Sequence, residues 1–326
     1  MILPPRPSRR ATSPENYIVS SFRSLNAPDR LLASWYVVLS LALLMRSRSF
    51  SYYGAYFKQH LVIIVFIFLF ANSAALGRWW RLVHDWYPTL VFVAAFEETA
   101  RLSLVFVPHW QDVIILRIEA ALFPVAPTAW LGRIHNSWIV EVLEFGYFTF
   151  YWIMFLVGGV LYKTVWKAKS SAAANDPRQS FRVWMDATVL GYVICYISYL
   201  LFPTEGPAHT LPRHVPSAFT GPFHWLVLFI QHQAGVHGNA FPSGHIMASV
   251  VALLAAAKWK PLLARWLTIP VLLMCIGAVY DGYHYSADIV AGALLGAAVF
   301  GLVSWSRGAS DRAARVSHLP QSTDAG

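Results

Sequence analysis

Charged residues are scarce in this sequence. They make up 13% of its 326 residues, whereas 57% are hydrophobic and 15% aromatic. Soluble domains carry roughly 25% charged residues, so a single water-soluble core explains the composition poorly. A membrane-spanning helix needs about 20 mostly apolar residues, and the chain contains several such runs. The composition therefore predicts an integral membrane protein.

Two further features are missing or sparse. The first 30 residues lack the apolar stretch of a cleavable signal peptide, and the Arg9-Arg10 pair has no long apolar run close behind it. We therefore interpret residues 1–30 as a cytosolic basic arm. Cysteine occurs only at Cys195 and Cys275, both inside apolar runs. These two residues are expected to be small buried hydrophobes rather than a disulfide or a metal pair.

The positive charge could suggest a nucleic-acid partner, because the formal net charge is +9. However, the basic residues cluster in residues 162–183 and 258–265, beside apolar runs, where the positive-inside rule applies. Of the 25 lysines and arginines, 18 fall on one side and six on the other if the N-terminus is cytosolic. This bias predicts that both termini are cytosolic and argues against nucleic acid as a partner.

The apolar runs predict an all-α, polytopic membrane helix bundle with about six to eight transmembrane helices. The expected membrane catalytic domain covers 31–305, with its core at 184–305, and residues 306–326 are expected to form a disordered cytosolic tail. Amphipathic pieces around 113–123 and 223–232 predict interfacial helices on the outer side. The candidate spans are 31–46, 61–76, 87–107, 138–161, 184–202, 243–257, 266–280 and 285–305.

Two polar motifs each stand directly before an apolar helix. The first is Pro242-Ser243-Gly244-His245, and the second contains His284 and Asp288. Both fall at the outer membrane face. The hydroxyl of Ser243 and backbone N–H groups at Gly244 would offer a phosphate-binding helix N-terminus. The motifs therefore predict a site that handles a phosphate group.

His284 and Asp288 are four residues apart, on one face of a helix. The carboxylate can bind one imidazole nitrogen and leave the other free as a nucleophile, while His245 protonates the departing oxygen. Three other interpretations remain open from these residues alone. A histidine can anchor the membrane interface, a His–Asp pair can be purely structural, and His245, His284 and Asp288 could bind zinc.

These motifs resemble the type-2 phosphatidic-acid phosphatase superfamily. The resemblance rests on Pro242-Ser243-Gly244-His245 and on His284-Tyr285-x-x-Asp288-Ile289-x-x-Gly292, and it covers about the last 130 residues, including 201–207. It implies that His245 is the acid, that His284 is the nucleophile supported by Asp288, and that no metal or other cofactor is needed. A lipid phosphatase or phosphotransferase acting through a phosphohistidine is the expected function.

The sequence departs from that superfamily at its basic residues. Its first motif, a lysine with a downstream Arg-Pro, has no clear match, and Ala278 stands where an arginine usually precedes the nucleophile. With Phe202-Pro203 and Gly206-Pro207, these losses resemble the branch of inositol phosphorylceramide and sphingomyelin synthases, which transfer a phospho-headgroup such as phosphoinositol between lipids. Candidates to hold the phosphate are Arg213 and His209, followed by Arg117 and Arg101.

Alternatives and partners follow from the same residues. A lipid or polyprenyl phosphate phosphatase is the alternative within the enzyme class. A non-catalytic transporter or proton relay, built on intramembrane residues such as Glu97, Glu98 and Arg101, is the rival from another class. Transporters commonly show repeat halves and broken midplane helices, which this sequence lacks. The expected partners are a phospholipid or lipid phosphate and the membrane, either bacterial inner membrane or a eukaryotic Golgi- or ER-type membrane.

Overall fold

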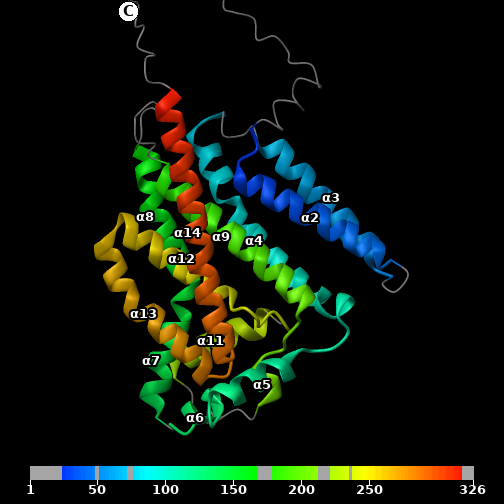
Figure 1. Cartoon of the computed structure of the whole chain (residues 1–326), viewed down its shortest axis with the longest axis vertical. Helices are drawn as coiled ribbons and strands as arrows, with labels where there is room; N and C mark the ends of the chain where they lie inside the picture. Colours follow the sequence, from blue (N-terminus) through cyan, green and yellow to red (C-terminus); the bar gives the residue numbers. More distant parts are fainter. Residues whose placement is uncertain are drawn as a thin grey trace, which may run out of the picture. The chain divides into compact units, whose positions relative to one another are not determined.

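The structure is a computed structural model that describes residues 24–47, 51–71, 76–134, 136–167, 178–211, 221–234 and 237–317. Within these ranges every regular element is a helix (Figure 1), which confirms the predicted all-α class. The helices are α2 (Ala27–Met45), α3 (Tyr53–Phe70), α4 (Arg78–Phe106), α5 (Asp112–Leu122), α6 (Pro127–Leu131), α7 (Ser137–Phe148), α8 (Phe150–Lys167), α9 (Gln179–Leu201), α10 (Pro207–Thr210), α11 (Pro222–Ala234), α12 (Gly244–Trp259), α13 (Pro261–Tyr280) and α14 (Ser286–Ser317).

Five of the described helices, α2, α3, α9, α13 and α14, are long and apolar enough to cross a membrane. Helices α7 and α8, bent by 42° at their junction, count as a sixth span together. The multi-pass bundle is thus confirmed, but two of the eight expected spans do not meet the length and composition of a membrane-spanning helix. The segment 87–107 lies in α4, which contains Pro88 and is too polar, and 243–257 is α12, whose 16 residues reach only about 24 Å.

The chain divides into two compact units, Met1–Leu90 and Val91–Gly326. In the first, α2 packs against α3, and Asn26 and Asp29 form a reciprocal capping box at the start of α2. The fully buried Asp29 also accepts a 2.6 Å hydrogen bond from the Tyr87 hydroxyl. Helix α2 begins at Ala27, so the helical part starts before residue 31, and residues 1–23 of the predicted arm lie outside the described residues.

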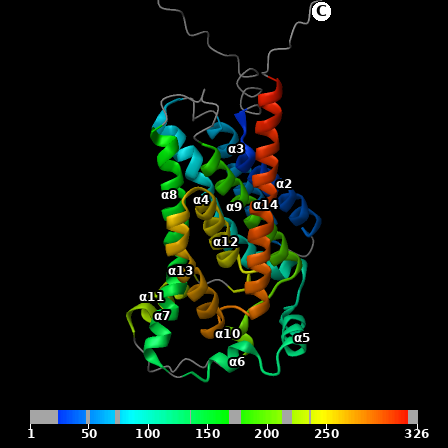
Figure 2. The same cartoon turned by 60° about the vertical axis from the view of Figure 1, so that its left-hand side comes forward.

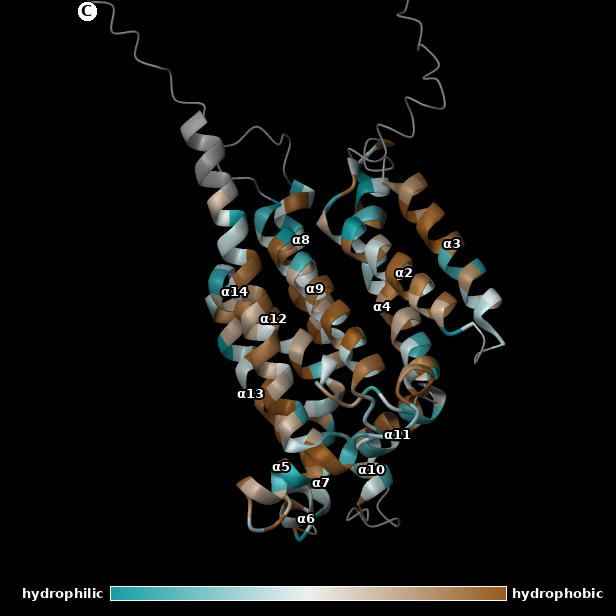
Figure 3. Cartoon of the chain, turned by 45° about the vertical axis from the view of Figure 1, so that its right-hand side comes forward, coloured by the Kyte–Doolittle hydropathy of each residue, from teal (hydrophilic) through white to brown (hydrophobic). Residues whose placement is uncertain are grey.

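Helix α12 is the centre of the second unit, where it packs against α8, α9, α13 and α14 (Figure 2). Its sequence is rich in alanine, and most of its residues are buried. Hydrophobic residues predominate along α9 and α12 (Figure 3). Small side chains on a helix let neighbouring backbones approach closely in a membrane, and α12 uses them on several sides.

Glycines allow the closest of these approaches. A Cβ atom at Gly292 of α14 would lie 2.5 Å from the carbonyl oxygen of Ser243, and one at Gly296 would lie 2.6 Å from that of Met247. The glycines of α14 at these positions therefore serve close helix packing. At Gly301, by contrast, an added Cβ would meet nothing within 4 Å.

The short helices of the second unit gather at one end of it. Figures 1 and 2 place α5, α6 and α11 at the end where α14 begins, opposite the end where α14 terminates. Helices α5 and α11 correspond to the two amphipathic pieces expected at 113–123 and 223–232.

Helix α14 continues to Ser317, so the prediction of a disordered tail from residue 306 is wrong for residues 306–317. The helical hydrogen-bond ladder simply extends beyond the apolar run.

Candidate active site

Ser243 begins helix α12 as its N-cap. Its side-chain oxygen accepts a 3.4 Å hydrogen bond from the backbone N–H of Ile246, as an N-cap serine does. The preceding segment is fixed by the end of α9. The hydroxyls of Ser198 and Tyr199 donate hydrogen bonds of 3.1 and 3.0 Å to the carbonyls of Phe241 and Pro242. The first predicted motif is therefore rigidly held.

Gly244 provides the room that this arrangement needs. A Cβ at Gly244 would lie 2.9 Å from the Tyr199 hydroxyl oxygen, so any larger residue would displace the tyrosine or the start of α12. The structure thus shows a packing reason for this glycine. Its expected contribution of backbone N–H groups to a phosphate site stays a prediction.

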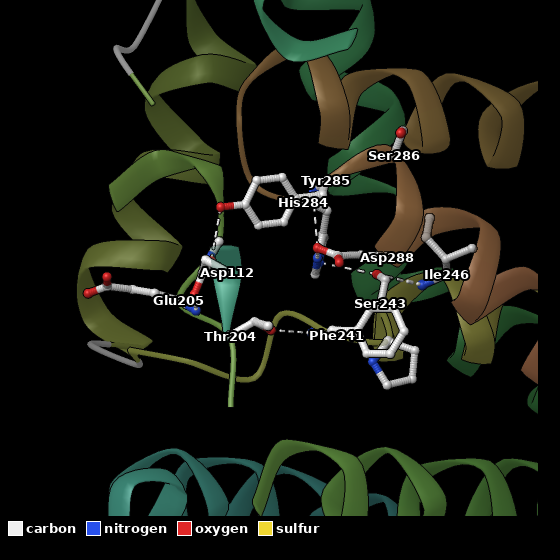
Figure 4. Close-up of polar contacts among 12 residues, drawn as sticks. Asp112, Thr204, Glu205, Phe241, Ser243, Ile246, His284, Tyr285, Ser286 and Asp288 are labelled. Carbon is white, nitrogen blue, oxygen red and sulfur yellow. Dashed lines mark hydrogen bonds and ion pairs between the residues drawn. The ribbon is translucent and has the colours of Figure 1, made fainter. Parts of the chain in front are cut away.

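His284 lies between the two helix starts. Its Nδ1 atom is 3.3 Å from the Oδ2 atom of Asp288 in the first turn of α14, and its Nε2 atom is 3.1 Å from the Ser243 hydroxyl oxygen (Figure 4). The Asp288 oxygen also accepts a 2.9 Å hydrogen bond from the Tyr285 N–H. The structure therefore brings together three of the predicted site residues, Ser243, His284 and Asp288.

These partners assign the protonation of the His284 ring. A carboxylate only accepts hydrogen bonds, so Nδ1 carries the proton that faces Asp288. Nε2 is then unprotonated and accepts a hydrogen bond from the Ser243 hydroxyl. The nitrogen lone pair needed for nucleophilic attack is on Nε2, at the start of α12.

Burial keeps the imidazole of His284 neutral. The residue is 5% exposed, and burial lowers its pKa to about 4 even though a hydrogen bond with the backbone at Ala240 acts in the opposite direction. A histidine with a depressed pKa is unprotonated at neutral pH.

His245 lies on the first turn of α12, with its ring centroid 6.0 Å from that of His284. Its other ring neighbours are aromatic, with centroids 4.3 Å away for Phe150, 5.8 Å for Tyr147 and 6.3 Å for Phe96. The two ring nitrogens of His284 face Asp288 and Ser243 rather than His245.

Asp112, at the start of α5, fixes the segment that follows α9. Its carboxylate accepts 2.9 Å hydrogen bonds from the N–H groups of Glu205 and Gly206 and from the Tyr285 hydroxyl. It is 3% exposed. This residue was missed among the predicted site residues. Its spacing of seven from Glu119, two helical turns along an amphipathic helix, was the signal that two carboxylates share one face.

Glu119, on the same helix, binds the start of α14. Its Oε1 atom accepts hydrogen bonds from the Ser286 N–H at 2.7 Å and from the Ser286 hydroxyl at 2.5 Å. Ser286 is the first residue of α14, so Glu119 satisfies N–H groups that a helix start leaves unpaired. Asp112 and Glu119 thus hold Tyr285 and Ser286, the two residues that follow His284.

A second buried network lies next to His245. The carboxylate of Glu144 accepts from the Tyr283 hydroxyl at 2.8 Å and lies 2.9 Å from Nδ1 of His224. Tyr147 packs against both Tyr283 and His245. Burial raises the pKa of Tyr283 well above its usual range, so its hydroxyl stays protonated and donates. Glu144, an ionisable residue in an apolar run, thus has hydrogen-bond partners on two other segments.

The basic residues predicted to bind the phosphate lie in different parts of the chain. Arg213 lies outside the described residues. His209 lies in the short helix α10, where its ring faces that of His237 at a centroid distance of 4.1 Å. Arg117 is exposed on α5, and Arg101 is exposed and forms an i,i+4 ion pair with Glu97 at 3.2 Å.

Ala278 marks the departure from the expected arginine. Its side chain is fully buried, and its carbonyl oxygen accepts hydrogen bonds of 2.9 Å from the N–H groups of both Tyr283 and His284. The backbone at this position thus holds the turn that carries His284. A long basic side chain has no space where the Ala278 methyl group is buried.

The sequence profile of the PAP2 superfamily matches residues 113–302, more than half of the chain. The protein belongs to the PAP2 superfamily. The matched range contains Ser243, His245, His284 and Asp288. A PA-phosphatase related-family protein of Dictyostelium discoideum is 26% identical over 182 residues, which is 51% of this chain but only 32% of that relative. No solved structure matches significantly.

The superfamily match therefore falls on a chain whose described helices include five that are long and apolar enough to cross a membrane. The chain spans about a third of the length of its Dictyostelium relative. Membership does not distinguish hydrolysis from group transfer, nor does it select the branch with inositol phosphorylceramide and sphingomyelin synthases.

Proposed function

We propose that this PAP2-superfamily protein is a membrane lipid phosphotransferase or phosphatase that works through a phosphohistidine at His284. One observation carries the proposal. Asp288 holds Nδ1 of His284, Nε2 is directed to the start of α12, and a second histidine, His245, lies 6.0 Å away ring to ring.

In the first step, Nε2 of His284 attacks the phosphorus atom of the lipid substrate. The bond between phosphorus and the leaving oxygen breaks, and protonated His245 gives that oxygen its proton. The developing charge on the His284 ring is stabilised by Asp288 through Nδ1–H. Ser243 and the N-terminal end of α12 offer a hydroxyl and the positive end of a helix dipole to the phosphate oxygens.

In the second step, an incoming oxygen nucleophile gives its proton to His245 and attacks the phosphorus atom, which releases His284. If the nucleophile is water, the product is a free phosphate or phosphorylated headgroup. If it is the hydroxyl of a second lipid, the headgroup is transferred. Both outcomes share the first step, so the access of water to the intermediate decides between them.

We propose transfer of a phospho-headgroup, such as phosphoinositol, as the specific reaction. The resemblance of the Phe202-Pro203 and Gly206-Pro207 segment to the synthase branch and the alanine at position 278 support it. The alternative is a lipid or polyprenyl phosphate phosphatase. A transporter or proton relay would leave the support of His284 by both Asp288 and Ser243 without a purpose.

The deciding experiment uses a phospholipid labelled in its headgroup phosphate and the full-length protein in detergent or vesicles. The assay is run with and without ceramide, diacylglycerol or inositol acceptors and scores free phosphate or headgroup against new labelled lipid. Acceptor-dependent formation of a new lipid establishes a transferase. Release of free label that does not depend on the acceptor establishes a phosphatase. If the wild-type protein turns over none of the phospholipids or lipid phosphates, the proposal of an enzyme is overturned.

A further inference from the structure

Three potential metal ligands converge outside the histidine pair just described. Glu205, His209 and His237 each offer one ligand atom, and these atoms all lie within 4.8 Å of one another. Nδ1 of His237 is 3.2 Å from Oε1 of Glu205, and the two imidazole centroids are 4.1 Å apart. It is the one group of this kind in the part of the chain that the structure describes.

The spacing suits a tetrahedral ion. Ligand atoms at the usual zinc distances of about 2.0–2.2 Å are separated by roughly 3.3–3.6 Å when they occupy tetrahedral corners. The Glu205–His237 separation already has this size, and the other pairs need only side-chain rotations. Two imidazoles and one carboxylate are a donor set that zinc favours, and three protein ligands leave a fourth position open.

The backbone that carries the ligands is fixed on both sides. Asp112 binds the N–H groups of Glu205 and Gly206. On the other side, the amide of Asn239 donates to the Phe96 carbonyl at 2.8 Å and to the Thr99 hydroxyl at 3.2 Å. A site whose ligands stand on a rigid backbone loses little conformational entropy when the ion binds.

The same two segments are joined to each other near the catalytic motif. The N–H of Phe241 donates to the Thr204 hydroxyl at 2.8 Å (Figure 4). The N–H of Ala240 donates to the Thr204 carbonyl at 3.3 Å. An ion between Glu205, His209 and His237 would therefore tie the segment after α9 to the segment that enters Ser243 and His245.

We propose that Glu205, His209 and His237 form a zinc site that clamps these two segments together beside the catalytic motif. The chemistry at His284 does not use this ion, because nucleophile and acid are both histidines of another cluster. The site goes beyond the proposed function and is tested without substrate.

The experiment measures zinc bound by full-length protein in detergent, after chelation and removal of the chelator, by equilibrium dialysis with metal analysis. Substitution with Co²⁺ adds an absorption spectrum that reports tetrahedral nitrogen and oxygen ligands. The variants are Glu205→Gln, His209→Ala and His237→Ala, together with the double variant of both histidines. His232→Ala on α11 is the matched control, since His232 is also an exposed histidine.

We expect one zinc ion per wild-type chain, a Tm that rises when zinc is added, and the same behaviour for His232→Ala. Each ligand variant should bind zinc at least about 100-fold more weakly and lose the rise in Tm, because even outer-sphere changes cost 10- to 100-fold. The metal-free Tm of each variant, compared with metal-free wild type, shows that it folds. If an alanine variant does not fold, Glu205→Gln still tests the site, because glutamine keeps the shape of the glutamate side chain.

Two results overturn the proposal. One is wild-type protein that binds no zinc at micromolar concentration, which would make the cluster an ordinary hydrogen-bonded surface group. The other is binding that survives in the double variant or falls equally in His232→Ala, which would place the metal elsewhere. Either result leaves the phosphohistidine proposal untouched, because no readout depends on turnover.

Discussion

Ser243 and His284 are 41 residues apart in the sequence, yet the hydroxyl of one lies 3.1 Å from Nε2 of the other. The backbone N–H of Ser243 also donates to the Asp288 carbonyl at 3.1 Å. The N-cap of α12 and the residues around the start of α14 are therefore one hydrogen-bonded unit. Its integrity depends on the close packing of two helices.

Replacement of either histidine should abolish the reaction and preserve the fold. We expect His284→Ala to lose nearly all activity, because no other group supplies the nucleophile, and His245→Ala to lose about 10²- to 10⁴-fold, the usual value of a general acid. Steady-state turnover of labelled lipid is the measurement, with His232→Ala as the control. Near-normal turnover in a well-folded His284→Ala protein would refute the mechanism.

Asp288→Asn should cost less than loss of the nucleophile but still a large factor, about 10²- to 10³-fold in kcat. The amide keeps the shape of the side chain but removes the charge that stabilises the imidazolium, and it replaces one acceptor oxygen by an NH2 donor that can favour the other tautomer of the ring. Substrate affinity should change much less, since Asp288 faces Nδ1 rather than the phosphate. A variant in which KM rises and kcat is unchanged would assign Asp288 to substrate binding instead.

The rate should depend on pH as a bell-shaped profile. Burial lowers the pKa of His284 to about 4, so the nucleophile is protonated and inactive below that value and the rate rises as pH increases through it. Burial lowers the pKa of His245 to about 3 in the protein without substrate, so the alkaline limb depends on bound phosphate, whose negative charge raises the pKa of His245 and retains its acid proton. The two limbs belong to the coupled pair. A kcat profile that stays flat from pH 3 to 9 counts against two-histidine catalysis.

Gly292 and Gly301 of α14 form a matched pair for helix packing. Gly292→Ala places a Cβ 2.5 Å from the Ser243 carbonyl, so we expect destabilisation of roughly 1–3 kcal/mol and reduced turnover as the catalytic motif shifts. Gly301→Ala meets nothing within 4 Å and should be neutral or slightly stabilising. Tm in detergent and lipid turnover are compared for the two variants. Equal Tm values for the two variants would show that the close packing of α12 against α14 at Gly292 does not contribute to stability.

The active site should face the outer or lumenal side, because the basic residues concentrate on the opposite side. In a cysteine-free protein, a single cysteine introduced by Ser217→Cys should be labelled in intact cells by an impermeant thiol reagent. One introduced by Ser171→Cys should react only after the membrane is permeabilised. Both positions lie outside the described residues and are chosen for their place in the expected loops. The reverse pattern would invert the topology.

The sequence by itself determined the fold class and the catalytic candidates. Apolar runs of spanning length specify membrane helices whatever their neighbours are. One motif, a proline, a serine, a glycine and a histidine, stands directly before an apolar run. The other, His284 with Asp288 four residues later, stands before a second apolar run. The sequence therefore places both groups at helix starts. Local spacing is enough for such statements, because each depends on residues within one or two turns.

Tertiary structure alone decided which distant groups support and surround that pair. Asp112 reaches Glu205, Gly206 and Tyr285, and Glu144 reaches His224 and Tyr283, across separations that no local pattern encodes. His209, expected near phosphate, lies beside Glu205 and His237 instead. Buried carboxylates must find hydrogen-bond donors wherever the packed helices bring them. Their partners are therefore fixed by how the helices pack, which spacing along the chain does not reveal.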